Sequence, residues 1–94
     1  FTRMLDGVDP DLVDKIRDET NHVKGVLSVN EIRVRWIGHQ LHAEVNITVD
    51  KVISVEEGHQ IANQVEHELI HHLQFLSKVI IHVDPDNASG EKFH

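Results

Sequence analysis

Residues 41–49 read LHAEVNITV, and this stretch decides the fold. Its odd-numbered positions are apolar and its even-numbered positions are polar, which is typical of a strand with one buried face. Residues 32–36, IRVRW, alternate in the same way just before it. Gly38 and His39 lie between the two stretches, so the sequence predicts an antiparallel β-hairpin with a short turn.

A first helix is predicted before the hairpin. Asp9 followed by Pro10 is typical of an N-cap and a first helical turn. Apolar residues then recur at helical spacing as far as Ile16, and Gly25 can adopt the left-handed conformation that follows many helices. The helix should therefore end between Asn21 and Gly25.

A second helix and a last strand are predicted after the hairpin. Ser54 and Glu57 have the spacing of a capping box, in which each side chain accepts a backbone N–H bond at the helix start. An apolar stripe follows at helical spacing, made of Ile61, Val65, Leu69 and Leu73. Residues 78–83, KVIIHV, are rich in β-branched side chains and predict a short strand that ends at Asp84-Pro85.

Together these elements predict an αββαβ domain of the α+β class. A strand–helix–strand crossover is nearly always right-handed and joins parallel strands, so the last strand should lie parallel to residues 41–49. We therefore expect a three-stranded mixed sheet with both helices on one face. The other face is left open, and an open face with two free edges favours dimerisation.

The composition fits one small, acidic domain. The chain has 94 residues, of which 39% are hydrophobic and 27% charged, and no apolar run approaches the ~20 residues of a membrane span. Sixteen acidic and nine basic residues give a net charge of −7, which opposes nucleic-acid binding and favours cations as partners. Cysteine is absent, which excludes thiolate metal sites, whereas nine histidines supply possible imidazole ligands.

The strands carry a candidate metal site. Alternation places His42 and Glu44 on the open face, and His82 and Asp84 share one face of the last strand, which the sequence allows to be the same face. Imidazole nitrogen and carboxylate oxygen suit zinc and other first-row divalent ions. His59, in the first turn of the second helix, is a further candidate that a second subunit could supply. Solvated surface groups are the alternative interpretation of all five residues.

Other polar residues of the second predicted helix have chelating spacing as well. His67 and His71 stand four residues apart, and so do Glu68 and His72. We favour a solvated helix face as the explanation of all four. Enzyme signatures such as a glycine-rich phosphate loop, an H-E-x-x-H pair or a G-x-S-x-G elbow do not occur, so we do not expect an enzyme.

Three stretches together resemble the C-terminal cytoplasmic domain of cation diffusion facilitator transporters. They are GVLSVNEIRVRWIGHQLHAEVNITVD, SVEEGHQIANQVEHEL and VIIHVDP, and they cover most of residues 9–85. The resemblance implies a metallochaperone-like, ferredoxin-like fold for residues 9–85 and a metal-sensing homodimer. It also implies that residues 1–8 are a linker from a missing membrane domain, and a first residue Phe1 rather than Met fits an excised fragment. Residues 86–94 are expected to be a flexible tail.

The same resemblance carries over to the candidate ligands. His82 and Asp84 match the family's metal-binding H-x-D in the last strand. His59 matches a helix-start histidine at the dimer interface, and His42 and Glu44 lie where some members carry strand ligands.

Two positions depart from the family's pattern. Asn30 and Asn46 stand where zinc-transporting members often have histidine, and an amide is a poor zinc ligand. A two-metal cluster of the family's kind would lose these ligands, and His42 and Glu44 could replace them and shift the site along the strand.

The resemblance predicts the cytoplasmic regulatory domain of an integral membrane cation exporter, in the inner membrane if the source is bacterial. Metal should stabilise a compact homodimer and thereby bias the protein's own membrane domain. We expect zinc, with iron and manganese as alternatives. Two other functions stay open: a purely structural dimerisation module and a soluble metallochaperone.

Overall fold

The structure is a computed structural model that describes residues 3–4 and 10–86. The predicted linker and tail therefore lie mostly outside the described residues. The elements are, in chain order, β1 (Arg3–Met4), α1 (Pro10–Asn21), β2 (Ser28–Ile37), β3 (Gln40–Val49), α2 (Val55–His72) and β4 (Leu76–Pro85). No described helix is both long and apolar enough to cross a bilayer.

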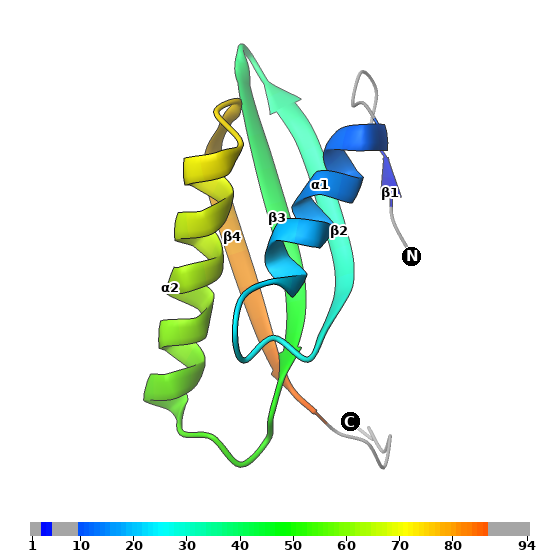
Figure 1. The fold of residues 1–94 in the computed structure, drawn as a ribbon. Coiled ribbons are helices and arrows are strands. Elements are labelled where there is room, and N and C mark those ends of the chain that lie inside the picture. Colours follow the sequence, from blue (N-terminus) through cyan, green and yellow to red (C-terminus); the bar gives the residue numbers. More distant parts are fainter. Residues whose placement is uncertain (1–2, 5–9, 87–94) are drawn as a thin grey trace.

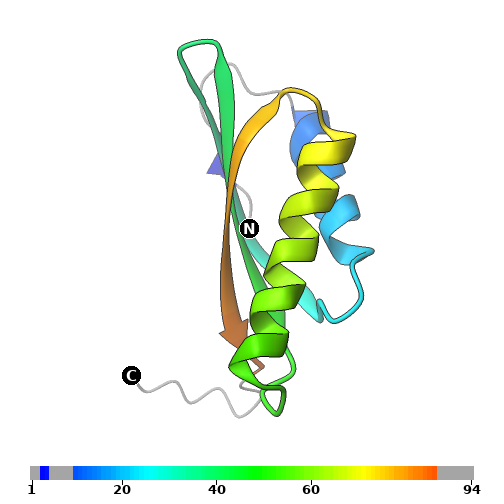
Figure 2. The ribbon, with the colours of Figure 1, turned by 90° about the vertical axis from the view of Figure 1, so that its left-hand side faces the viewer.

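One mixed sheet forms the first layer of the molecule, and both helices form the second (Figures 1 and 2). The strand order is β1-β2-β3-β4. β2 pairs antiparallel with β3, and β4 pairs parallel with β3, so the predicted αββαβ order and mixed sheet are confirmed. β1 adds a fourth strand, parallel to β2, which we did not predict because two residues show no periodicity.

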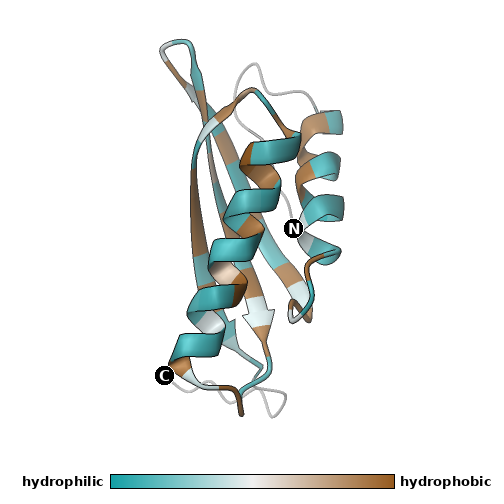
Figure 3. Ribbon diagram, turned by 60° about the vertical axis from the view of Figure 1, so that its left-hand side comes forward, coloured by the Kyte–Doolittle hydropathy of each residue, from teal (hydrophilic) through white to brown (hydrophobic). Residues whose placement is uncertain are grey.

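The core lies between the sheet and the helices. Every odd-numbered residue of β3 from Leu41 to Val49 is buried, as the alternation predicted. Ile16 of α1 and Leu69 of α2 are fully buried against this layer. Figure 3 shows hydrophilic residues along the solvent side of the helices, as expected for amphipathic helices that cover one face.

The predicted start of α2 is confirmed at atomic detail. The Ser54 Oγ accepts a hydrogen bond from the Glu57 backbone N–H at 3.0 Å, and the Glu57 Oε1 accepts one from the Ser54 N–H at 3.1 Å. The capping box thus gives acceptors to two backbone N–H groups that have no partner within the helix. This cap sets where α2 begins relative to β3.

Glycine is required at two bends. Gly38 has φ +64° in the two-residue turn between β2 and β3, as in a type II′ hairpin turn. Gly25, which follows α1, has φ +101°, and a Cβ added there would lie 2.6 Å from the Ile61 Cδ1 atom of α2. Glycine is therefore needed at position 25 for two reasons: it adopts the positive φ of the turn, and its lack of a Cβ lets the loop lie close to α2.

A Gly25→Ala substitution should destabilise the fold by about 2–4 kcal/mol, because backbone strain and overpacking against Ile61 add together. Gly38→Ala is the matched control, since it has positive φ but nothing within 4 Å of the added Cβ. It should cost about 1–2 kcal/mol of backbone strain alone. Urea denaturation of both variants measures the difference, and equal losses would contradict the role assigned to the Ile61 contact.

Candidate metal centres

The open face of the sheet lies opposite the helices and carries the even-numbered residues of β3 and, from Lys78 onward, of β4. In the β3–β4 register, Glu44 lies beside Ile80 and Asn46 beside His82. His42, further toward the hairpin, and Asp84, further toward the end of β4, follow the same alternation. The structure thus places all four predicted strand ligands on one face.

The same register spreads these four residues along the strands. The His82 Nε2 atom lies 3.9 Å from the Glu44 Oε2 atom, and this is the pair that the structure brings together. His42 lies beside Lys78 and Asp84 beside Thr48, six residues apart along each strand, which is about 20 Å at ~3.3 Å per residue. His42 and Asp84 therefore cannot share an ion with each other in this arrangement.

An arginine neutralises the acidic part of the open face. The Arg33 Nε lies 3.1 Å from the Glu31 Oε2, and its Nη1 lies 3.8 Å from the Glu44 Oε1. Glu31, Arg33, Glu44, Asn46 and His82 line a shallow hollow of about 200 Å³. Because the guanidinium lies beside Glu44, it competes with any cation that this carboxylate would bind.

Asn30 and Asn46 form a hydrogen-bond network across β2 and β3. The Asn30 Nδ2 donates to the Asn46 Oδ1 at 3.0 Å and to the Thr48 Oγ1 at 2.7 Å. A β-bulge between Val29 and Glu31 places Asn30 there as the unpaired extra residue. The amide oxygen of Asn46 already accepts a hydrogen bond, which it would have to give up to ligate a cation.

His59 lies away from the open face. It is exposed in the first part of α2 and lines a separate hollow of about 490 Å³ with Val83 and Pro85. Val83 lies on the helix side of β4, whereas its neighbour His82 lies on the open face. Within one chain, the structure therefore does not bring His59 together with Glu44 and His82.

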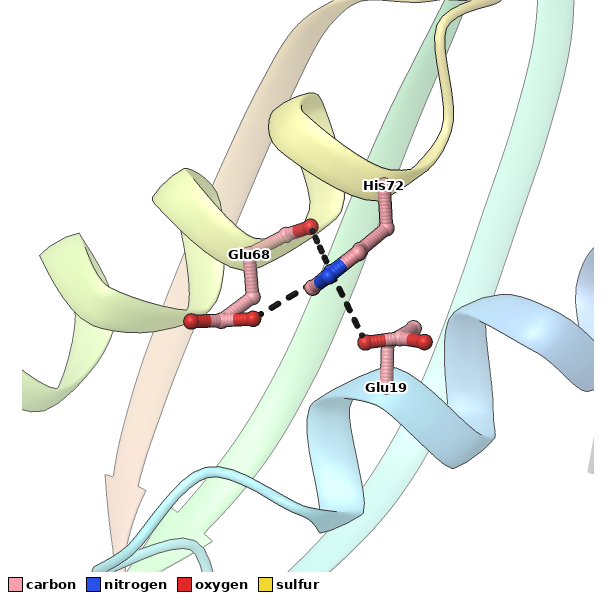
Figure 4. Close-up of side chains that lie close together, drawn as sticks. All are labelled: Glu19, Glu68 and His72. Atoms are coloured by element: carbon pink, nitrogen blue, oxygen red, sulfur yellow. Dashed lines mark hydrogen bonds and ion pairs between the residues drawn. The ribbon is translucent and has the colours of Figure 1, made fainter.

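A different group of ligand types meets between the two helices. Among the described residues, Glu19, Glu68 and His72 form the single set of three whose ligand atoms all lie within 4.8 Å of one another. The His72 Nδ1 is 3.1 Å from the Glu19 Oε1 and 3.2 Å from the Glu68 Oε1 (Figure 4). The four-residue spacing of Glu68 and His72 was a sequence signal, but nothing in the sequence pointed to Glu19 on another helix.

The remaining histidine pair of α2 stays on the helix surface. The rings of His67 and His71 stack at a centroid distance of 5.8 Å and an interplanar angle of 7°. Both are exposed, and neither belongs to the group formed by Glu19, Glu68 and His72. Their placement agrees with the solvated helix face that we favoured for this pair.

Comparison with known proteins identifies relatives of the whole domain. A family model described as the cytoplasmic domain of cation efflux proteins matches residues 8–86. A probable cation efflux system protein of Mycobacterium tuberculosis is 42% identical over 85 residues, which cover 90% of this chain and 26% of that protein. The manganese efflux system protein MneP of Bacillus subtilis is 28% identical over 82 residues, covering 87% of this chain and 28% of that protein. The chain thus spans about a quarter of the length of these curated relatives.

Solved structures share the fold. A MamM C-terminal domain variant, described as a nickel form, superposes with a TM-score of 0.80 at 22% sequence identity and covers 83% of this chain and 99% of its own. Other MamM variants are described as copper and cadmium forms, with TM-scores of 0.78 and 0.79. The match to the family model over most of its length shows that this chain belongs to the cation diffusion facilitator family of cation efflux proteins, in the region of the family's cytoplasmic domain.

Proposed function

We propose that this chain is the metal-sensing cytoplasmic domain of a divalent cation efflux transporter and that it acts as a homodimer. The observation that carries the proposal is the Glu44–His82 pair, 3.9 Å apart on the open face of a domain from this family. One carboxylate and one imidazole are ligands that zinc accepts, and zinc is the ion that we propose. Manganese and iron are the alternatives, and MneP is named as a manganese efflux protein.

The incomplete ligand sets support dimerisation. Glu44 and His82 supply two of the four ligands that a tetrahedral zinc site needs. Among the described residues, no third His, Asp or Glu has a ligand atom within 4.8 Å of both members of this pair, so His42, Asp84 and His59 do not complete the site within one chain in this arrangement. A second copy can supply the missing ligands. The family model that matches this chain, ZT_dimer, is named for a dimer.

A metal ion would then act by differential affinity. Ligands from two chains meet only in a compact dimer, so the ion favours that arrangement over a looser one. Each chain carries a net charge of −7, and a bound cation also lowers the repulsion between two such domains. Metal occupancy in the cytoplasm would in this way bias the membrane domain of the transporter.

Arg33 supports the competing function, a purely structural dimerisation module. It pairs with both Glu31 and Glu44, so the acidic groups of the open face are partly neutralised without any metal. In that case the open face serves only as a contact surface between copies. Zinc titration separates the two functions.

His82→Ala should weaken zinc binding to the open face by about tenfold or more, since the loss of a direct ligand should cost at least as much as the loss of an outer-shell partner. It should also abolish a zinc-dependent increase in sedimentation coefficient. Calorimetry and analytical ultracentrifugation make these measurements. His39→Ala, an exposed histidine in the hairpin turn, is the control. Unchanged zinc-driven association of His82→Ala would contradict the assignment of His82 as a ligand, whereas a wild type that neither binds zinc nor associates more in its presence would favour the structural module.

Arg33→Gln should have the opposite effect, because it removes the cation that competes for Glu44. Zinc binding at the open face should become about two- to fivefold tighter, in proportion to a lost surface ion pair. Arg35→Gln removes the same charge two residues along β2, beside His42, and controls for net charge. If both variants raise the affinity equally in calorimetry, general electrostatics and not the Glu44 contact explains the gain.

A further inference from the structure

The group formed by Glu19, Glu68 and His72 joins the two helices on the side of the molecule away from the open face (Figure 4). Glu68 and His72 lie one turn apart at the end of α2, and Glu19 lies in the last turn of α1. The His72 imidazole lies between the two carboxylates, so all three side chains converge on one point.

The centre of this group requires a hydrogen-bond donor or a cation. The His72 Nδ1 faces three oxygens, because the backbone oxygen of Glu68 lies 3.1 Å away in addition to the carboxylate oxygens of Glu68 and Glu19 at 3.2 and 3.1 Å. A bare nitrogen lone pair would be repelled by all three oxygens. Either a proton on Nδ1 or a metal cation among the same atoms removes that repulsion.

The distances suit a metal ion. Zinc lies about 2.0–2.1 Å from nitrogen and oxygen ligands, so neighbouring ligand atoms in a tetrahedral site are about 3.3 Å apart. The nitrogen of His72 lies 3.1 and 3.2 Å from its two carboxylate neighbours. An ion can therefore replace the proton with only small shifts of these side chains.

We propose that Glu19, Glu68 and His72 bind one divalent first-row cation within a single chain and thereby clamp α1 to α2. One imidazole and two carboxylates suit zinc, manganese and ferrous iron, with zinc the tightest of the three. The three side chains are 30–45% exposed, so water can reach the ion and complete its coordination. This site is separate from the open face and needs no second copy.

A neighbouring amide orients one of the carboxylates. The Gln64 Nε2 donates a hydrogen bond of 2.9 Å to the Glu68 Oε2. The other oxygen, Oε1, is the one that faces His72. Outer hydrogen bonds of this kind hold ligands in place and commonly accompany metal sites.

The clamp would act on stability and not on association. Its ligands come from two helices that are brought together only in the folded chain, so an ion bound there stabilises the folded state by mass action. The open-face ion that we proposed above instead requires two chains. A measurement on the monomer can therefore separate the two sites.

The test uses the 94-residue chain with His82→Ala, which disables the open face, and zinc chloride as the probe. Zinc at a hundredfold excess over its dissociation constant should raise the melting temperature by about 10–20 °C. Adding Glu19→Gln should abolish the rise while it keeps the shape of the side chain. Glu66→Gln, an exposed carboxylate of α2 outside the group, is the matched control and should keep the rise.

The melting temperature of each variant is compared with and without zinc, so any effect of the substitution on the metal-free melting temperature cancels. If Glu19→Gln does not fold, His72→Gln takes its place. Manganese should in addition broaden the amide NMR signals around residues 19, 68 and 72 in the His82→Ala chain. The clamp is refuted if zinc gives no rise in the His82→Ala chain, or if the rise survives in both ligand variants. Zinc-driven dimerisation of the wild type bears only on the open-face site, so the two proposals fail separately.

Discussion

The rest of the structure depends on the register of β3. This strand pairs antiparallel with β2 on one side and parallel with β4 on the other, and its odd-numbered residues are buried beneath both helices. A slip of one residue would move Val45 and Ile47 to solvent and turn Glu44 and Asn46 into the core. The core thus enforces the orientation of the polar residues, and the open face receives its charges because the opposite face must be apolar.

Strand geometry also limits what the open face can bind. Residues that share a face of one strand recur every second position, about 7 Å apart, so the open face spreads its candidate ligands along the strands. The pair that the structure brings together lies across two neighbouring strands, with Glu44 on β3 and His82 on β4. Completion by a second copy follows naturally from such a surface, and the departures at Asn30 and Asn46 reduce the ligands available from one chain further.

The helix layer obeys a different rule. Side chains four residues apart on a helix lie on the same side, and a second helix packed beside the first can add a third ligand at close range. Glu19, Glu68 and His72 meet in this way within one chain. The domain therefore offers two kinds of arrangement, an open sheet face suited to linking two copies and a helix junction suited to stabilising one.

The sequence by itself determined the elements from α1 to β4 and their order, because alternation in residues 41–49, the capping box at Ser54 and the turn glycines are local signals. It also determined which residues of one strand share a face, since parity along a strand does not depend on distant contacts, whereas the register of β3 and β4 decided that His42, Glu44, His82 and Asp84 share the open face. Tertiary structure alone decided which of them meet. The offset between β3 and β4 placed Glu44 diagonally across from His82 and separated His42 from Asp84. The packing of α1 against α2 brought Glu19 to His72. Such offsets and packings depend on how distant segments fill a shared core, and no short stretch of sequence encodes them.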